Sequence, residues 1–390
     1  MLLLFLFLGI AVGIVFGIIP GLHPNFLVVF APLMFFSSTS EEIIVFVVAM
    51  SVSNVISDYI PSILFGAPEE GTELSVTPGH RMLLAGHGRQ AIKLAVMGSV
   101  FSVLLICLLF PAIILVFPAI YSLLQPLLFF LLAAISVYMV LAQDHVIEAA
   151  LCFVLSGIVG VSLHNFPIDA SLALFPVLSG LFGASMLIVQ FRQKVVAVKK
   201  QKPDEYVSPR LVKRSVLFGS LGGIFSGLLP GVGTSQVASL ATVDKNEKSF
   251  LVTLGALATS NILISIVSLW LIGKARSGAS IIIANYAALG FNDVLLILFT
   301  AVFAAGVAAI VTLRLSGMFL GIIEKVNYVT VSKIIFLVIL SSVAIFSGFF
   351  GLFLFFSCTA LGLFAYLSRI RMSCLMAVLI VPTMMFYFPF

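Results

Sequence analysis

Two long stretches of this sequence contain no charged side chain, and they limit what the chain can fold into. One extends from Leu94 to Gln143 and the other from Val294 to Leu313. Each is long enough to cross a bilayer core of ~30 Å at least once as a helix. Of the 390 residues, 62% are hydrophobic and 9% are charged, whereas a soluble globular protein has roughly half apolar and a quarter charged residues. The sequence therefore predicts an all-α polytopic membrane protein that crosses the cell membrane several times.

The N-terminal segment and the cysteines give no indication of processing or of a bound metal. Met1 to Ile19 lacks a basic n-region and a small-residue cleavage site, so we expect it to remain as a membrane segment. The four cysteines, Cys107, Cys152, Cys358 and Cys374, stand singly in apolar surroundings, without a CxxC pair or a histidine at ligand spacing. We expect them to pack in the interior, with no disulfide framework, metal or cofactor.

Basic residues are concentrated in the middle of the chain. Between Arg192 and Arg214 lie eight of the 20 basic residues, against the two acids Asp204 and Glu205. The positive-inside rule places such a short loop in the cytoplasm. Nucleic-acid binding is the other use of a basic run, but between membrane helices a topology signal is simpler. The run predicts a first transmembrane repeat (residues 1–191), a basic linker (192–214) and a second repeat (215–390).

One motif occurs at the start of each half. GIVFGIIPGLHPN begins at Gly13 and GIFSGLLPGVGTS begins at Gly223, both with the form GxxxGxxPG. Two glycines four residues apart allow another helix backbone to approach closely, and the Pro-Gly pair then ends the helix. A broken apolar helix in each half of a membrane protein indicates a transport site.

Other landmarks repeat at similar offsets. The first motif recurs after 210 residues, Ser53-Asn54 recurs after 207 as Ser260-Asn261, and Pro176 is matched by Pro382 after 206. We therefore expect two homologous halves with about 10–14 membrane segments. The halves are either inverted or parallel, and inverted halves are favoured because transporters with duplicated broken helices commonly have them. Residues 1–36 form either a re-entrant hairpin or a broken spanning helix.

Motifs of known enzymes are missing from the sequence. It has no HExxH, no GxSxG and no P-loop, and its five histidines are scattered. We therefore expect a protein that is not an enzyme and does not use ATP itself. A transporter of this kind takes its energy from an ion gradient, here of Na⁺ or H⁺.

Two asparagines and one aspartate are the candidate ion-coupling residues. Asn54 and Asn261 occupy matching places, and each amide offers an oxygen to a cation and hydrogens to a carboxylate. The alternative is that they tie helices together by hydrogen bonds. Asn54, Ser57 and Asp58 share one helix face. Asp58 is either a desolvated, neutral proton-coupling group or a paired or hydrated residue at the membrane surface near Tyr59 and Pro61.

The helix breaks complete the predicted substrate site. Backbone amides freed at a helix start attract anions, and carbonyls freed at a helix end attract cations; the hydroxyls there serve the ligand or act as caps. Besides Asn54 and Asn261, the candidate substrate-binding residues are Pro20, Gly21, His23, Asn25, Pro230, Gly231, Gly233, Thr234 and Ser235.

Cations in two loops are candidates for recruiting an anionic substrate. Arg81 and Arg89 lie in the polar stretch 66–90, and Lys274 and Arg276 lie in the corresponding loop of the second half. The alternative is that these side chains snorkel at membrane ends. The stretch 66–90 is either a plain connection or a gate.

The stretch GAPEEGTELSVTPGHRMLLAGHGRQAIKLA, with the PG of the first helix and the later PGVG, resembles the large membrane subunit of tripartite tricarboxylate transporters, the TctA family. The resemblance covers residues 10–100 well and 215–285 loosely. It departs from the family pattern at His23-Pro24-Asn25 and at Ser57-Asp58-Tyr59. The family positions matched are Pro68, Thr77, Gly79, Met82, Gly86 and Gly88.

The resemblance implies a secondary transporter of small carboxylates such as citrate. It also implies a small membrane subunit and an extracytoplasmic binding protein as partners, although a stand-alone permease is also consistent with the sequence. The leading hypothesis is an ion-coupled permease of a small organic anion, embedded among membrane lipids and able to form a homodimer. The alternatives are a carrier or flippase for an anionic lipid such as a polyprenyl phosphate, and a scaffold without transport activity.

Overall fold

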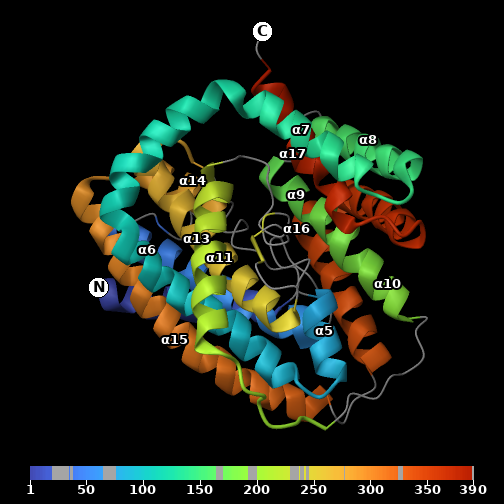
Figure 1. Cartoon of the computed structure of the whole chain (residues 1–390), viewed down its shortest axis with the longest axis horizontal. Coiled ribbons are helices and arrows are strands. Elements are labelled where there is room, and N and C mark those ends of the chain that lie inside the picture. Colours follow the sequence, from blue (N-terminus) through green and yellow to red (C-terminus); the bar gives the residue numbers. More distant parts are fainter. Residues whose placement is uncertain are drawn as a thin grey trace.

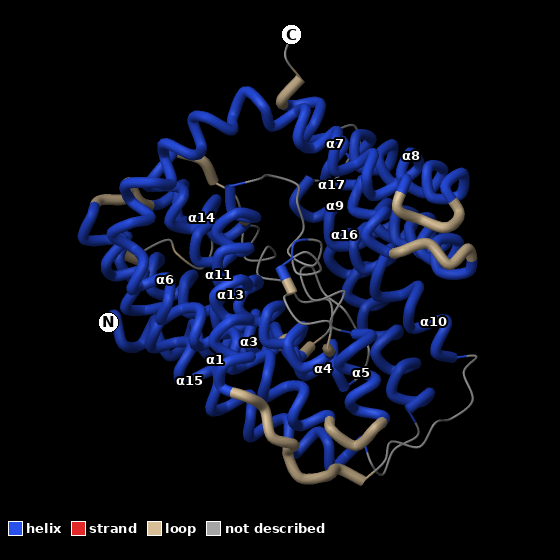
Figure 2. The backbone as a smooth tube through the Cα atoms, in the orientation of Figure 1, coloured by secondary structure: helices blue, strands red, loops and turns tan. Residues whose placement is uncertain are grey.

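The structure is a computed structural model. It describes residues 1–19, 35, 38–64, 76–163, 170–191, 200–228, 237, 241–242, 246–275, 277–323 and 328–388. Within these ranges all regular elements are helices and none is a strand (Figure 2). Five helices are long and apolar enough to cross a membrane, and four shorter helices are also apolar. The predicted all-α polytopic membrane protein is therefore confirmed.

The helices form two groups, each containing elements from both halves of the chain. The first helix group shares one apolar core. From the first half it contains α1 (Leu2–Ile18), α3 (Ser40–Ser57), α4 (Tyr59–Leu64), α5 (Val76–Leu84) and α6 (Gly88–Leu124). From the second half it contains α11 (Pro209–Leu228), α13 (Glu247–Ile272), α14 (Gly278–Tyr286) and α15 (Phe291–Ile323).

The second helix group has its own apolar cores. It contains α7 (Leu128–Leu141), α8 (Val146–Ser162), α9 (Ala170–Leu178), the π-helix η4 (Ser179–Ala184), α10 (Ser185–Phe191), α16 (Tyr328–Leu367), the short 3₁₀ helix η5 (Met372–Met376) and α17 (Ala377–Phe386). The 3₁₀ turn η2 (Gln125–Leu127) joins α6 to α7. Figure 1 shows the two groups next to each other, with α6 and α7 running as an arc from one to the other.

The two helices that carry the Ser-Asn pairs are the most enclosed spans of the molecule. In their most apolar stretches, 94% of residues are buried in α3–α4 and 83% in α13. The corresponding shares are 33% for α6–α7 and 28% for α16, whose remaining side chains suit contact with lipid. The chain therefore surrounds α3 and α13 with the other helices.

The first helix of each half packs on the Ser-Asn helix of the same half through glycines. A Cβ added to Gly9 would lie 2.5 Å from the Phe46 carbonyl oxygen, and one added to Gly219 would lie 2.5 Å from the Thr253 carbonyl oxygen. A side chain at either position would push the helices apart. The facing pairs are Gly9–Phe46, Gly13–Met50 and Gly17–Asn54 in the first half, and Gly219–Thr253, Gly223–Leu257 and Gly227–Asn261 in the second. The same parallel crossing therefore occurs once in each half.

Across the halves, the long helices exchange partners. α6 of the first half packs on α13, while α15 of the second half packs on α3. Gly98 faces the Val252 carbonyl and Gly255 faces the Ala95 carbonyl, so α6 and α13 are in backbone contact. Ser99 Oγ donates to the Gly255 carbonyl oxygen at 3.1 Å. Each half thus buries its central helix against the other half.

Contacts at the helix ends give the directions of these helices. The N-terminal ends of α6 and α13 lie together, because Gln90 and Lys248 both contact Glu205. At the other end, Ser40 Oγ donates to the Tyr286 carbonyl oxygen at 3.1 Å, just before α15 begins, and Trp270 near the end of α13 contacts Phe291. α3 and α13 therefore run in opposite directions, as do α6 and α15.

The helix α11 begins within the basic stretch 192–214. Its first residue is Pro209, and proline at the first helical position has no amide hydrogen to leave unpaired. Arg210, Lys213 and Arg214, which the sequence assigns to the linker, therefore lie in the first turns of α11. The end of the molecule that holds residues 200–206 and these cations is called the linker end below.

Candidate functional site

A group of polar side chains is buried where α3 meets α4. Ser53, Asn54, Ser57 and Asp58 are at most 3% exposed. About 21 Å of helix separates Asn54 from Ser40, at 1.5 Å per residue, which is less than the ~30 Å of a bilayer core. Asp58 is 3% exposed, so its carboxyl group is enclosed by protein.

Several donors in this group have no acceptor. Ser57 Oγ donates to the Ser53 carbonyl oxygen at 2.7 Å, in the way that serines pair within helices. Within the described ranges, Asn54 Nδ2, Ser53 Oγ and Ser62 Oγ have no hydrogen-bond partner. A buried donor left without an acceptor costs about 1–3 kcal/mol. The arrangement therefore favours a bound acceptor, either a ligand or water.

The end of α1 lies directly against this group. A Cβ added to Gly17 would be 2.5 Å from the Asn54 carbonyl oxygen, and Ser57 Oγ is 3.5 Å from the Gly13 carbonyl oxygen. α1 ends at Ile18, two residues before Pro20. α1 therefore ends beside Asn54, just before the Pro20-Gly21 pair at which the sequence predicts a helix break.

The second half repeats this placement with a different polar environment. α11 ends at Leu228, two residues before Pro230, and Gly227 faces Asn261. Asn261 is partly exposed, and its Oδ1 accepts a hydrogen bond from Ser226 Oγ at 3.0 Å. The interhelical-bond alternative thus describes Asn261, whereas the Asn54 amide nitrogen has no such bond to the described residues.

The two halves also differ in charge at the site. The offset of 207 residues that relates Asn54 to Asn261 makes Ser265 the counterpart of Asp58. Ser265 is buried on α13. The aspartate therefore belongs to the first half alone. Its neighbour Tyr59 is fully buried and lies against Ser99 of α6.

Further serine hydroxyl groups lie in the interface between the two halves of the chain. Ser102 Oγ donates to the Ala256 carbonyl oxygen at 2.8 Å, and Ser220 Oγ donates to Ser102 Oγ at 2.8 Å. These serines come from α6 and α11 and meet on α13. Sequence patterns could not identify this group, because isolated serines in apolar helices are usually packing residues.

The remaining predicted site residues fall outside the described ranges. They are Pro20, Gly21, His23, Asn25, Pro230, Gly231, Gly233, Thr234, Ser235 and Arg276.

The described candidate cations do not gather at one place. Arg81 is at the linker end, where its Nε lies 3.1 Å from Glu247 Oε1. Arg89 is exposed at the same end, while Lys274 is exposed beyond the C-terminal end of α13, at the opposite end. If these cations recruit anions, they do so from two sides of the membrane.

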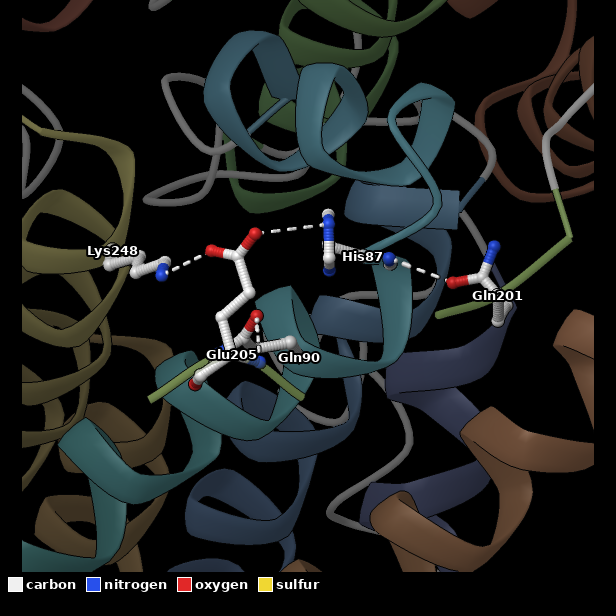
Figure 3. Close-up of polar contacts among 6 residues, drawn as sticks. His87, Gln90, Gln201, Glu205 and Lys248 are labelled. Atoms are coloured by element: carbon white, nitrogen blue, oxygen red, sulfur yellow. Dashed lines mark hydrogen bonds and ion pairs between the residues drawn. The ribbon is translucent and has the colours of Figure 1, made fainter. Parts of the chain in front are cut away.

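An extended part of the linker, Gln201–Glu205, is docked on both halves; we call it the linker strap (Figure 3). Gln201 Oε1 accepts from the Gly88 amide at 2.9 Å and from the Arg89 amide at 3.4 Å. It therefore caps the N-terminus of α6 from a distant position in the sequence. Lys202 N also donates to the Gly86 carbonyl oxygen at 2.8 Å.

Glu205 links the strap to α13. Its carboxylate lies 2.5 Å from Lys248 Nζ and 3.3 Å from His87 Nε2, as Figure 3 shows. The hydrogen bond and charge of Lys248, together with His87, hold the pKa of the Glu205 carboxyl below its usual range. Gln90 Nε2 donates to the Glu205 carbonyl oxygen at 2.6 Å. The strap therefore joins the start of α6 to the start of α13.

Comparison with known proteins identifies the family. The tripartite tricarboxylate transporter TctA family model matches residues 3–377, so the similarity extends well beyond the two stretches recognised in the sequence. An uncharacterized protein of Methanocaldococcus jannaschii is 30% identical over 402 residues, covering 99% of this chain and 98% of that protein. No solved structure matches the chain. The chain therefore belongs to the tripartite tricarboxylate transporter TctA family.

Proposed function

We propose that this protein is the membrane-spanning part of an ion-coupled transporter for a small organic anion, most simply a carboxylate. The observation that carries the proposal is the group of buried donors without acceptors at Ser53, Asn54 and Ser62. A carboxylate brings two oxygens that accept hydrogen bonds and no donors. Such a ligand would satisfy donors that the described residues leave unpaired.

The neighbouring Asp58 supplies a reason for ion coupling. Two carboxylates cannot both remain charged in a site of low dielectric, because each raises the pKa of the other. An anion bound beside Asp58 therefore requires either a proton on Asp58 or a cation such as Na⁺ next to it. Anion and ion would then enter together, and the gradient of the ion would drive uptake.

We further propose that the two halves are inverted repeats. The opposite directions of α3 and α13, and of α6 and α15, support this arrangement. In transporters built from inverted repeats, each half can adopt the conformation of the other, which exposes the site alternately to the two sides. The different environments of Asn54 and Asn261 are consistent with one such asymmetric state.

The family is the large component of a tripartite system. We therefore propose that a small membrane subunit and an extracytoplasmic binding protein deliver the anion to this chain. Transport by the chain alone would instead make it a stand-alone permease, and the two cases differ in whether uptake requires the added subunits.

Uptake of labelled citrate and succinate into proteoliposomes tests the proposal, with imposed Na⁺ or H⁺ gradients and with or without the two partner subunits. We expect uptake to follow one of the gradients and to fall more than tenfold in Asn54→Ala. Ser122→Ala, which removes an exposed hydroxyl on α6 that bonds only the Ala119 carbonyl oxygen of its own helix, is the control and keeps its uptake. Absence of uptake under every condition, or normal uptake by Asn54→Ala, contradicts the proposal.

A further inference from the structure

The outer face of α11 combines exposed cations with an exposed apolar stripe. Arg210, Lys213 and Arg214 are exposed in the first turns of the helix. Further along the same side, the exposed apolar residues are Leu217, Phe218, Leu221 and Phe225, each 42–46% exposed. Positions three and four apart lie on one helix face, so cations and apolar side chains form one continuous surface, the α11 outer face.

The opposite side of α11 is fully used in packing. Gly219 and Gly223 approach α13, Ser215 Oγ lies 2.9 Å from Ser249 Oγ, and Ser220 Oγ bonds Ser102 Oγ. These contacts fix the rotation of the helix about its axis. The packing of α11 on its neighbours therefore determines that the α11 outer face points away from the other helices.

The cations of this face differ from three other cations at the linker end, which form ion pairs. Arg81 pairs with Glu247, Lys93 with Asp204, and Lys248 with Glu205. In the part of the chain that the structure describes, Arg210, Lys213 and Arg214 form no ion pair. Three cations within two helical turns are thus left without an internal counter-charge.

We propose that the α11 outer face binds an anionic phospholipid, with its headgroup phosphate on Arg210, Lys213 and Arg214 and its acyl chains along Leu217, Leu221 and Phe225. The headgroup and acyl parts of a phospholipid are arranged in the same order as the cations and the apolar stripe along the helix. Basic residues at a membrane surface attract anionic lipids, and arginine matches phosphate oxygens in a bidentate manner. At the offset of 210 residues that relates α1 to α11, Lys213 and Arg214 are matched by Leu3 and Leu4, so α1 has no cations at these two positions.

Lipid-dependent stability of the purified full chain in detergent tests the proposal. We expect added phosphatidylglycerol to raise the unfolding temperature, and phosphatidylcholine with the same acyl chains to leave it nearly unchanged. The increment should shrink between low and high salt, because salt screens exposed charges. Native mass spectrometry gives the affinities directly.

The variant Arg210→Gln/Lys213→Gln/Arg214→Gln should bind phosphatidylglycerol roughly a hundredfold more weakly, at about fivefold for each cation. Its unfolding temperature without lipid should match that of the unmodified chain, because the side chains are exposed. Lys200→Gln/Lys202→Gln/Lys274→Gln removes the same charge elsewhere and should retain the lipid effect. If the triple variant fails to fold, the three single substitutions provide the same comparison.

Leu217→Ala/Leu221→Ala/Phe225→Ala separates a lipid from a free anion. We expect weaker binding of phosphatidylglycerol, because less apolar surface remains for the acyl chains. Equal effects of the two lipids, an equal loss in the charge control, or the same thermal shift with inorganic phosphate alone would each overturn the proposal.

Discussion

Asn54 and Asn261 show how two residues at matching positions can have different roles. Both lie beside the last glycine of the first helix in their half. Asn261 accepts a hydrogen bond from Ser226, whereas Asn54 Nδ2 is buried without an acceptor among the described residues. A residue of the first kind stabilises the fold, and a residue of the second kind destabilises it until a ligand binds.

This difference predicts opposite effects of replacing each asparagine by leucine, which has a similar shape. Asn54→Leu should leave the free energy of unfolding unchanged or raise it by about 1 kcal/mol, because an unpaired donor is removed. Asn261→Leu should lower it by about 1 kcal/mol, because the bond from Ser226 is lost. Thermal unfolding in detergent without substrate measures both. Destabilisation by Asn54→Leu equal to that of Asn261→Leu would contradict the assigned roles.

Glycine contacts give a second prediction at the residue scale. In Gly255→Ala the new methyl group would collide with the Ala95 carbonyl, so α6 and α13 must separate. We expect a loss of about 1–3 kcal/mol in the free energy of unfolding, as for other overpacked interiors. Gly306→Ala on α15 is the matched control, because no atom lies within 4 Å of the added carbon. It should be neutral or slightly stabilising in a helix. Similar unfolding temperatures for the two variants would rule out the close crossing.

Among the elements, the linker strap is an ion-paired clamp whose strength depends on pH. The folded-state pKa of Glu205 is lowered by Lys248 and His87. Its contribution to stability is therefore complete above the ordinary glutamate pKa and is lost as the pH falls through the lowered value.

Glu205→Gln should consequently lower the unfolding temperature at neutral pH and have little effect at strongly acidic pH. A series of melts from neutral to acidic pH measures the difference between the two proteins. Glu41→Gln, an exposed acid at the opposite end, controls for the change in net charge. A difference that persists unchanged into strong acid would show that the carboxylate does not hold the strap.

Sequence reasoning predicted the parts of these elements that depend on local pattern. α1 and α11 end two residues before the prolines of their Pro-Gly pairs, where proline lacks the amide hydrogen and glycine accepts non-helical dihedrals. Proline alone does not end a helix in this chain, since α6 contains Pro111 and Pro118. The strap was missed, because Gln201 caps a helix that begins more than a hundred residues earlier and such a pair leaves no periodic signal. Charge alone does not give the start of α11, because basic residues fit well within a helix.

For the candidate site, the sequence pattern indicated Asn54, Asp58 and Asn261 as candidates but could not show which amide has a partner. That depends on Ser226 facing Asn261 across two helices, while the matching first-half position is Phe16, whose side chain offers no donor. The exchange of α6 and α15 between halves was also beyond the sequence, because both helices are apolar on several sides and any apolar partner would satisfy them.

For the whole molecule, the packing of α6 on α13 and of α15 on α3 predicts how the chain behaves when it is cleaved between the halves. Each central helix is buried by a long helix from the other half, so neither half can cover its own apolar surface. We expect a chain cleaved between Val207 and Ser208 to remain assembled, and each half expressed alone to aggregate or be degraded. Co-purification through a tag on one half measures assembly. Stable, separate folding of residues 1–207 would refute the intertwined arrangement.

The docking of Gln201 also sets a mechanical limit on the molecule. The second helix group is joined to the linker through α10, which ends at Phe191. Covalent geometry allows at most about 35 Å between Phe191 and a strap anchored at Gln201, close to the thickness of a bilayer core. If the strap detaches and the linker is free as far as Pro209, the largest possible distance between Phe191 and the next anchored residue rises to about 60 Å. Five docked residues thus shorten one covalent connection between the helix groups, which are also joined directly where α6 continues through η2 into α7.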